Sequence, residues 1–160
     1  MLPIPKKRYY EAKESLYDQD FYLWTKKQAK LLRGHRKELA SIDVDVTNLA
    51  EEIESLGRRD RISLCRHTVS VLVDTLRKKY TPSKADAYAH PAWVRSNTGS
   101  AREVESILKD SPSLLRDFQK RFSECYTHAR ECIAAETGID IKTFPELCPW
   151  ELMDIFPFAN

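Results

Sequence analysis

The longest regular pattern of apolar and polar residues lies at residues 46–80, a stretch with no proline and one glycine, Gly57. Its apolar residues recur at helical spacing but change sides. The first face is formed by Leu49, Ile53 and Leu56, and a nearly opposite face further on by Ile62, Cys65, Val69, Leu72 and Leu76. The mismatch between periods of 3.6 and 3.5 turns a stripe by only about 20° per heptad, so drift does not explain the switch. We predict one continuous helix that packs against different partners on its two sides; a break near Gly57 is the alternative.

A helix is also predicted before this stretch, from Asp18 or Asp20 to about Leu39, because either aspartate can cap its N-terminus. One side of it is apolar and carries Phe21, Trp24, Leu31, Leu32 and Leu39. The opposite side is basic and carries Lys26, Lys30, Arg33 and Lys37. This helix is therefore expected to bury one side and expose the other.

Further helices are predicted after a proline-bracketed loop at residues 81–92. One runs from about residue 93 to 109. The next is expected to be capped by Ser111 and to end at Gly138, since glycine readily adopts the left-handed conformation that closes a helix. A short C-terminal helix is expected to begin at Pro149.

These elements together predict an all-α fold, a four-helix-bundle-like domain with a short C-terminal helix. Residues 16–160 are expected to form a single domain behind an extended N-terminal arm at residues 1–15. A chain of 160 residues can bury enough apolar surface to fold without a metal or disulfide. The predicted core comprises Phe21, Trp24, Leu31, Ile53, Leu56, Val69, Leu72, Trp93, Val104, Leu108, Leu115, Phe118, Phe122 and Ala129.

The charge is nearly balanced, with 26 basic and 24 acidic residues, which argues against a dedicated polyanion-binding protein. No apolar run reaches the length of a membrane span, and the N-terminus lacks the apolar segment of a secretory signal. We therefore expect a cytoplasmic protein with no membrane contact, in which the four cysteines are reduced thiols.

Several short motifs occur in an order that resembles a known bacterial family, the domain of unknown function 29 family. They are Leu16-Tyr17, Asp20-Phe21 with Trp24, Leu49 to Gly57 (LAEEIESLG), Asp110 to Leu114 (DSPSL), Glu136-Thr137-Gly138, Phe144-Pro145 and Cys148-Pro149-Trp150. The resemblance covers roughly residues 16–155 and implies an all-helical, bundle-like fold. It implies no activity, because the family has no established function.

A zinc site is one hypothesis for the cysteines. Cys125, His128 and Cys132 occur at i, i+3 and i+7 of a predicted helix, and Cys65 could supply a fourth ligand. However, there is no CxxC motif, and Cys125 and Cys132 also fit the apolar stripe, where free cysteine acts as a small hydrophobic residue. The missing motif and the long spacing of the candidate ligands favour this core interpretation, and we expect no cofactor.

Catalytic groups are weakly indicated. A di-iron bundle requires inward Glu-x-x-His motifs, and the sequence contains none. Asp60, His67 and Asp74 form a row that could act in acid–base chemistry, but apolar residues interrupt it. We therefore expect a non-enzymatic protein, and a metal-dependent enzyme remains the third hypothesis.

Binding is the function that the pattern favours. The side switch within residues 46–80 leaves an apolar patch that one four-helix core does not cover, which predicts an interaction module that self-associates as a homodimer or binds a protein partner. The alternative is a nucleic-acid-binding protein that uses the basic side formed by Lys26, Lys30, Arg33 and Lys37.

Overall fold

The computed structural model describes residues 15–81 and 99–159, and within these residues all regular structure is helical, which confirms the all-α prediction. The helices are α1 (Leu16–Gln19), α2 (Phe21–Gly34), α3 (Arg36–Ala40), α4 (Val46–Tyr80), an unlabelled helix at residues 99–110, α6 (Leu114–Thr137), the 3-10 helix η1 (Ile141–Thr143) and α7 (Leu152–Ile155). The predicted arm, most of the predicted loop at 81–92, the start of the third helix and Trp93 lie outside the described residues.

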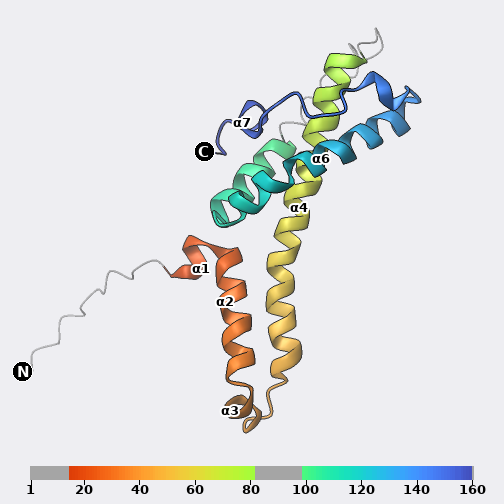
Figure 1. The fold of residues 1–160 in the computed structure, drawn as a ribbon. Coiled ribbons are helices and arrows are strands. Elements are labelled where there is room, and N and C mark those ends of the chain that lie inside the picture. Colours follow the sequence, from red (N-terminus) through yellow and green to blue (C-terminus); the bar gives the residue numbers. More distant parts are fainter. Residues whose placement is uncertain (1–14, 82–98, 160) are drawn as a thin grey trace, which may run out of the picture.

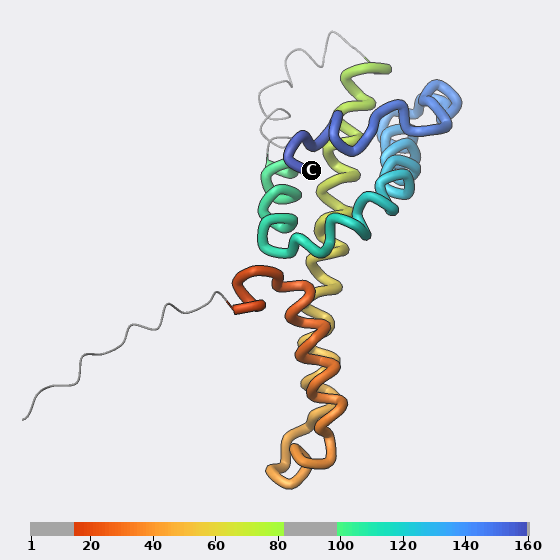
Figure 2. Tube along the Cα trace, turned by 60° about the vertical axis from the view of Figure 1, so that its left-hand side comes forward, coloured from red at the N-terminus to blue at the C-terminus, as the bar shows by residue number. Residues whose placement is uncertain are grey.

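Helix α4 is continuous over 35 residues and passes through Gly57 without a break, as predicted. It begins after Asp45, whose carboxylate accepts a hydrogen bond from the Asn48 N–H and so caps the N-terminus. The helix joins two regions of the molecule (Figures 1 and 2). We call residues 15–60, with α1, α2, α3 and the first part of α4, the stalk, and the remaining described residues from 61 onward the head.

The head holds the main apolar core, in which the second half of α4 packs against α6 and the C-terminal segment. Its buried members include Leu64, Leu72, Leu76, Val104, Leu114, Phe118, Phe122, Tyr126, Ala129, Ile133, Phe144 and Phe156. The Tyr126 hydroxyl donates to the carbonyl of Pro145, which ties the C-terminal segment to α6. Several elements thus enclose α4 in the head.

The main part of the stalk is a hairpin of two antiparallel helices, α2 and the first half of α4, which are connected through α3 (Figure 2). Its buried contact uses small side chains, Thr25 and Ala29 from α2 and Ala50 and Gly57 from α4. A Cβ atom at Gly57 would lie only 2.5 Å from the Thr25 Oγ1. The absence of a side chain at Gly57 therefore allows the two helices to approach closely.

The predicted first helix is interrupted, because α2 ends at Gly34 and α3 starts at Arg36. Between them, the N–H of His35 bonds to the carbonyls of Leu31 and Leu32, and its ring Nδ1 bonds to the Leu31 carbonyl. Glycine at position 34 weakens the helix at this point. Lys37 consequently belongs to α3 and not to the helix that carries the other predicted bases.

The predicted N-cap at Ser111 is wrong, because α6 begins at Leu114 after Ser113. The Ser111 hydroxyl instead accepts a hydrogen bond from the Tyr22 N–H of α2. At the other end, Gly138 closes α6 with φ of 71°, as predicted. The C-terminal helix α7 begins at Leu152, three residues after the predicted start at Pro149.

The core prediction holds in the head and fails in part in the stalk. Buried residues that were predicted are Leu72, Val104, Phe118, Phe122 and Ala129. Leu31 and Leu56 are 44% and 38% exposed, so their assignment to the core is wrong. Around Leu31 and Leu56 only α2 and α4 pack together, and an apolar side that points away from their contact has nothing described to pack against.

Candidate functional site

Asp20 is the centre of the contact between stalk and head. Its carboxylate accepts hydrogen bonds from the Leu23 N–H, which caps α2, and from both the N–H and the hydroxyl of Ser113. Beside it, the fully buried Ser111 accepts from the Tyr22 N–H. The Asp20-Phe21 and Asp110 to Leu114 motifs, which carry the family resemblance, therefore meet at one hydrogen-bonded joint.

An aromatic cluster of Tyr17, Phe21 and Trp24 lies beside this joint. The Tyr17 ring contacts the other two edge-on, at centroid distances of 5.4 Å and 4.9 Å, and Phe21 stacks on Trp24 at 5.8 Å. Tyr17 is 52% exposed. Aromatic rings with one exposed side are a common feature of protein interfaces.

A shallow hollow beside the cluster is acidic and is lined by Tyr17, Asp18, Phe21, Asp60 and Asp110. Partial burial raises the pKa of Asp60, and the nearby charge of Asp110 raises it further. The hollow therefore carries an electrostatic cost that a neutral residue at position 60 would remove.

The two edges of the stalk differ in chemistry. Arg33 of α2 and Glu54 of α4 form an ion pair of 2.7 Å across one edge. At 3.6 residues per turn, Trp24 and Leu31 lie on the side of α2 opposite Arg33. By the same geometry, Leu49 and Leu56 lie nearly opposite Glu54 on α4. These four residues, Trp24, Leu31, Leu49 and Leu56, thus share the other edge, which we call the apolar face.

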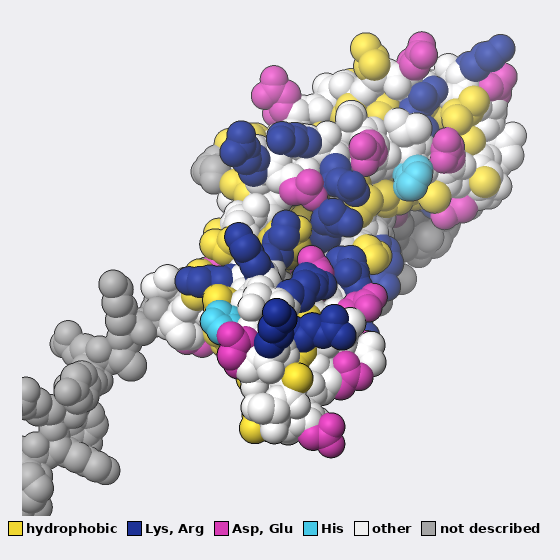
Figure 3. All heavy atoms as spheres, turned by 60° about the horizontal axis from the view of Figure 1, so that its bottom comes forward, with side chains coloured by type: hydrophobic (Ala, Val, Ile, Leu, Met, Phe, Trp, Pro, Cys, Tyr) yellow, Lys and Arg dark blue, Asp and Glu magenta, His cyan; other side chains and the backbone are white. Residues whose placement is uncertain are grey.

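Around the Arg33–Glu54 pair lies the basic face, which we define as Lys26, Lys30, Arg33, Arg58 and Arg61 (Figure 3 shows the gathered Lys and Arg side chains). The hydrogen bond from Arg33 lowers the pKa of Glu54, and the charges of Arg33, Arg58 and Lys26 lower it further. Several cations therefore surround one carboxylate. Three of the four predicted nucleic-acid contacts lie here, and Lys37 lies on α3.

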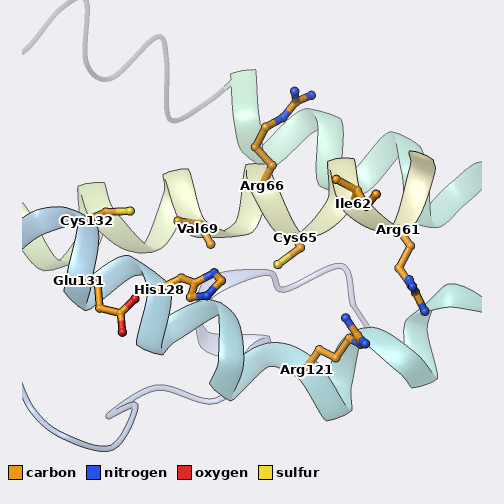
Figure 4. A pocket seen from close by; sticks show the side chains of 9 residues that line it. All are labelled: Arg61, Ile62, Cys65, Arg66, Val69, Arg121, His128, Glu131 and Cys132. Carbon is orange, nitrogen blue, oxygen red and sulfur yellow. The ribbon is translucent and has the colours of Figure 1, made fainter. Parts of the chain in front are cut away.

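Beyond Arg61 the basic face continues into a groove between α4 and α6, with a volume of about 590 Å³. Its lining is Arg61, Ile62, Cys65, Arg66, Val69, Arg121, His128, Glu131 and Cys132. Figure 4 shows Arg61 and Arg121 reaching toward each other at one end, while Arg66 and Glu131 point away from the cavity. We call this cavity the α4–α6 groove.

The thiol groups of Cys65 and Cys125 lie next to each other, with their Sγ atoms 2.9 Å apart. Cys65 is partly exposed on the groove, whereas Cys125 is fully buried. Burial raises the pKa of Cys125 strongly, and the contact with Cys65 raises it further. Cys125 is therefore a protonated thiol at neutral pH.

The hypothetical zinc ligands come together only in part. Cys65, His128 and Cys132 line the same groove, and Cys125 contacts Cys65 from the core. However, no group of three or more His, Cys, Asp and Glu residues is arranged to hold a metal ion in the described segments, 15–81 and 99–159. Cys125 packs in the core, as the core interpretation predicted, whereas Cys132 is exposed, so its assignment to the apolar stripe is wrong.

Sequence reasoning missed Arg58 and Arg61 as members of the basic face and Arg121 as part of the groove that continues it. Arg58 and Arg61 belong to the polar run GRRDR, which is visible in the sequence. Their proximity to α2 and α6 depends on tertiary packing, which no local pattern specifies. A charged run beside a predicted side switch nevertheless indicates that this part of the helix is exposed to solvent.

No described helix is long and apolar enough to cross a membrane.

Comparison with known proteins identifies the family of this chain. No curated protein and no solved structure matches the chain. The model of one family matches residues 16–158, nearly the whole chain, and confirms the resemblance found in the motifs. The chain therefore belongs to the family described as Domain of unknown function DUF29.

Proposed function

We propose that this protein is a non-enzymatic interaction module that binds a second copy of itself through the apolar face of the stalk. The observation that carries the proposal is the exposure of three leucines on one edge of a two-helix hairpin. Leu31, Leu49 and Leu56 are 44%, 42% and 38% exposed. Two such hairpins packed face to face form a four-helix arrangement, which covers the side that each leaves open.

The charges of the stalk favour a second copy as the partner. On α2, Lys27 lies three residues after Trp24 and four before Leu31, and on α4 Glu52 lies three residues after Leu49 and four before Leu56, so both charges border the apolar face. A copy related by a two-fold axis along the stalk places its α2 over the α4 of the first. Lys27 of each copy then lies near Glu52 of the other, which is electrostatically favourable.

The test compares the same substitution, leucine to glutamate, inside the apolar face and away from it. Leu49→Glu with Leu56→Glu should convert a dimer into a monomer, as measured by size-exclusion chromatography with light scattering. The control is Leu147→Glu, at a residue that is 82% exposed in the C-terminal segment, which should leave the dimer intact. Equal behaviour of the two variants would contradict the proposal.

A charge exchange tests the orientation of the copies. The antiparallel hairpin, with Gly57 beside Tyr22, places Glu52 level with the turn of α2 that holds Lys27. Lys27→Glu and Glu52→Lys should each weaken association, and the double variant should restore it. A double variant weaker than either single variant would exclude this arrangement.

Nucleic-acid binding through the basic face is the second candidate. Its support is the concentration of Lys26, Arg33 and Arg58 around a single carboxylate, Glu54, with Arg61 leading into the α4–α6 groove. Such a band suits a phosphate backbone, because each neutralised phosphate releases counterions.

Fluorescence polarisation with labelled single-stranded RNA and double-stranded DNA tests this candidate. Lys30→Glu with Arg58→Glu should abolish binding, and the affinity of the wild type should fall steeply with salt. Lys142→Glu, an exposed change on η1, is the matched control and should bind like the wild type. Absence of wild-type binding at low salt would exclude the candidate.

A further inference from the structure

We propose that Cys65 and Cys125 are a peroxide-sensitive thiol pair that closes into a disulfide between α4 and α6. The two Sγ atoms already lie 2.9 Å apart. A disulfide requires about 2.05 Å, so the sulfur atoms have to move by less than about 1 Å. The bond would link residues 60 positions apart in the sequence, on the two longest helices of the head.

Only one thiol of the pair, that of Cys65, is accessible from solvent. Cys65 lies on the α4–α6 groove, and Figure 4 shows its sulfur pointing into the cavity from α4. Cys125 has no exposed surface. Hydrogen peroxide is small enough to enter a groove of about 590 Å³. Cys65 is therefore the thiol that meets the oxidant, and Cys125 is the thiol that resolves the product.

The chemistry proceeds in two steps. The Cys65 thiolate attacks one peroxide oxygen, the O–O bond breaks, and the departing hydroxide takes a proton to become water, which leaves Cys65 as a sulfenic acid. The Cys125 sulfur then attacks the Cys65 sulfur, the S–O bond breaks, and the leaving hydroxide takes the Cys125 proton. Two thiols lose two electrons in total, and one peroxide becomes two waters.

The second step is expected to be slow at neutral pH. Burial holds Cys125 as a thiol, because it raises the pKa of this group well above the ordinary value. The attacking species is the thiolate, so disulfide formation should accelerate as the pH rises. The sulfenic acid on Cys65 should persist long enough to be captured at pH 7.

The other two cysteines are not placed to compete. Cys148 donates its S–H to the Trp150 carbonyl at 3.2 Å, in the C-terminal segment. Cys132 is exposed on the groove, but its sulfur makes no contact with another sulfur among the described residues. Substitution of Cys132 and Cys148 therefore serves as the control.

The test treats the full chain with hydrogen peroxide and maps disulfides by mass spectrometry of a non-reduced digest. A cross-linked peptide pair containing residues 65 and 125, lighter by two hydrogen atoms, is the expected product. Its formation should raise the melting temperature by about 5–10 °C, and dithiothreitol should reverse the shift. Cys132→Ser with Cys148→Ser should behave like the wild type.

Two further variants separate the steps. Cys65→Ser should remove the disulfide and the thermal shift. Cys125→Ala, which keeps the small apolar volume at a buried position, should leave Cys65 as a sulfenic acid that dimedone labels. A wild-type protein in which peroxide yields only over-oxidised Cys65, or a disulfide between any other cysteines, would overturn the proposal.

Discussion

The two halves of α4 belong to one continuous helix but lie in opposite environments. In the head, its buried residues point in several directions and are Leu64, Thr68, Val71, Leu72, Val73, Asp74 and Leu76. In the stalk, the buried residues are Val46, Ala50 and Gly57, which share the side that contacts α2. The second half of α4 leaves one large apolar side chain exposed, Ile62 at 64% beside the α4–α6 groove, whereas the first half, covered on one side, exposes Leu49 and Leu56 on a single edge.

This difference is the basis for the proposed division between scaffold and binding surface. The head contains its own core, in which the second half of α4 is buried. In the stalk, α2 and α4 contact each other mainly through small residues, and the stalk exposes leucines on one edge and cations on the other. The hydrogen bonds of Asp20 to Ser113 fix the stalk relative to the head, so both of its edges are held in a defined direction.

The largest expected effect contrasts one leucine from each half of α4. Leu72→Ala empties a fully buried site in the head and should lower the free energy of unfolding by about 2–5 kcal/mol. Leu49→Ala in the stalk should lower it by less than about 1 kcal/mol, because 42% of this residue is already exposed to solvent. Urea unfolding at low protein concentration measures both. Similar losses at the two sites would remove the distinction between scaffold and surface.

The next effect concerns the joint between the two regions. Asp20→Ala removes the cap of α2 and leaves two donors of Ser113 without their acceptor, at a cost of about 2–3 kcal/mol. Asp45→Ala is the matched control, because the carboxylate of Asp45 caps α4 through bonds to residues close in sequence, chiefly Asn48, and it should cost about 1 kcal/mol. Chemical denaturation gives both values, and equal costs would show that Asp20 is only a helix cap.

Gly57 tests the close approach of the stalk helices. Gly57→Ala places a Cβ 2.5 Å from the Thr25 Oγ1 and 3.0 Å from the Tyr22 ring, a clash that typically costs about 1–3 kcal/mol. The gain in helix propensity offsets about 1 kcal/mol of this cost, so a net loss near 1 kcal/mol is expected. Gly34→Ala has no neighbour within 4 Å of its Cβ and should not destabilise the fold. A higher melting temperature for Gly57→Ala would refute the close packing.

The smallest effect is electrostatic and depends on pH. Because the pKa of Asp60 is raised in the folded state, folded protein binds this proton more tightly than unfolded protein does. Ionisation of Asp60 therefore costs stability above its ordinary pKa of 3.8. Asp60→Asn should slightly raise the melting temperature at pH 7, and the gain should vanish as the pH falls below that value. A gain that persists in acid would point to a cause other than charge.

Local signals in the sequence were sufficient to predict much of the fold. The Asp20 cap, the left-handed Gly138 and the unbroken run through Gly57 are properties of a few neighbouring residues, and all three are confirmed. Ser111 was misassigned because its hydroxyl accepts a bond from Tyr22, 89 positions away, and no local pattern contains that partner. The exposure of Leu56 was missed for a related reason: periodicity indicates the side of a residue but not what covers it.

The candidate surfaces were predictable to a smaller extent. Lys26, Lys30 and Arg33 follow from the pattern of one helix, and the structure adds Arg58 and Arg121 from two other helices. From the sequence, Cys65 and Cys125 could be placed together only through the hypothesis of a shared zinc site. Their actual relation, a sulfur contact between core and groove, depends on how α4 packs against α6.

Self-association of the stalk is the central claim, and sedimentation velocity over a dilution series tests it most directly. The wild-type protein should sediment as a dimer at high concentration and shift toward the monomer on dilution, while Leu56→Glu should sediment as a monomer throughout. A wild-type protein that remains monomeric at every concentration, with the same sedimentation coefficient as Leu56→Glu, would contradict the account.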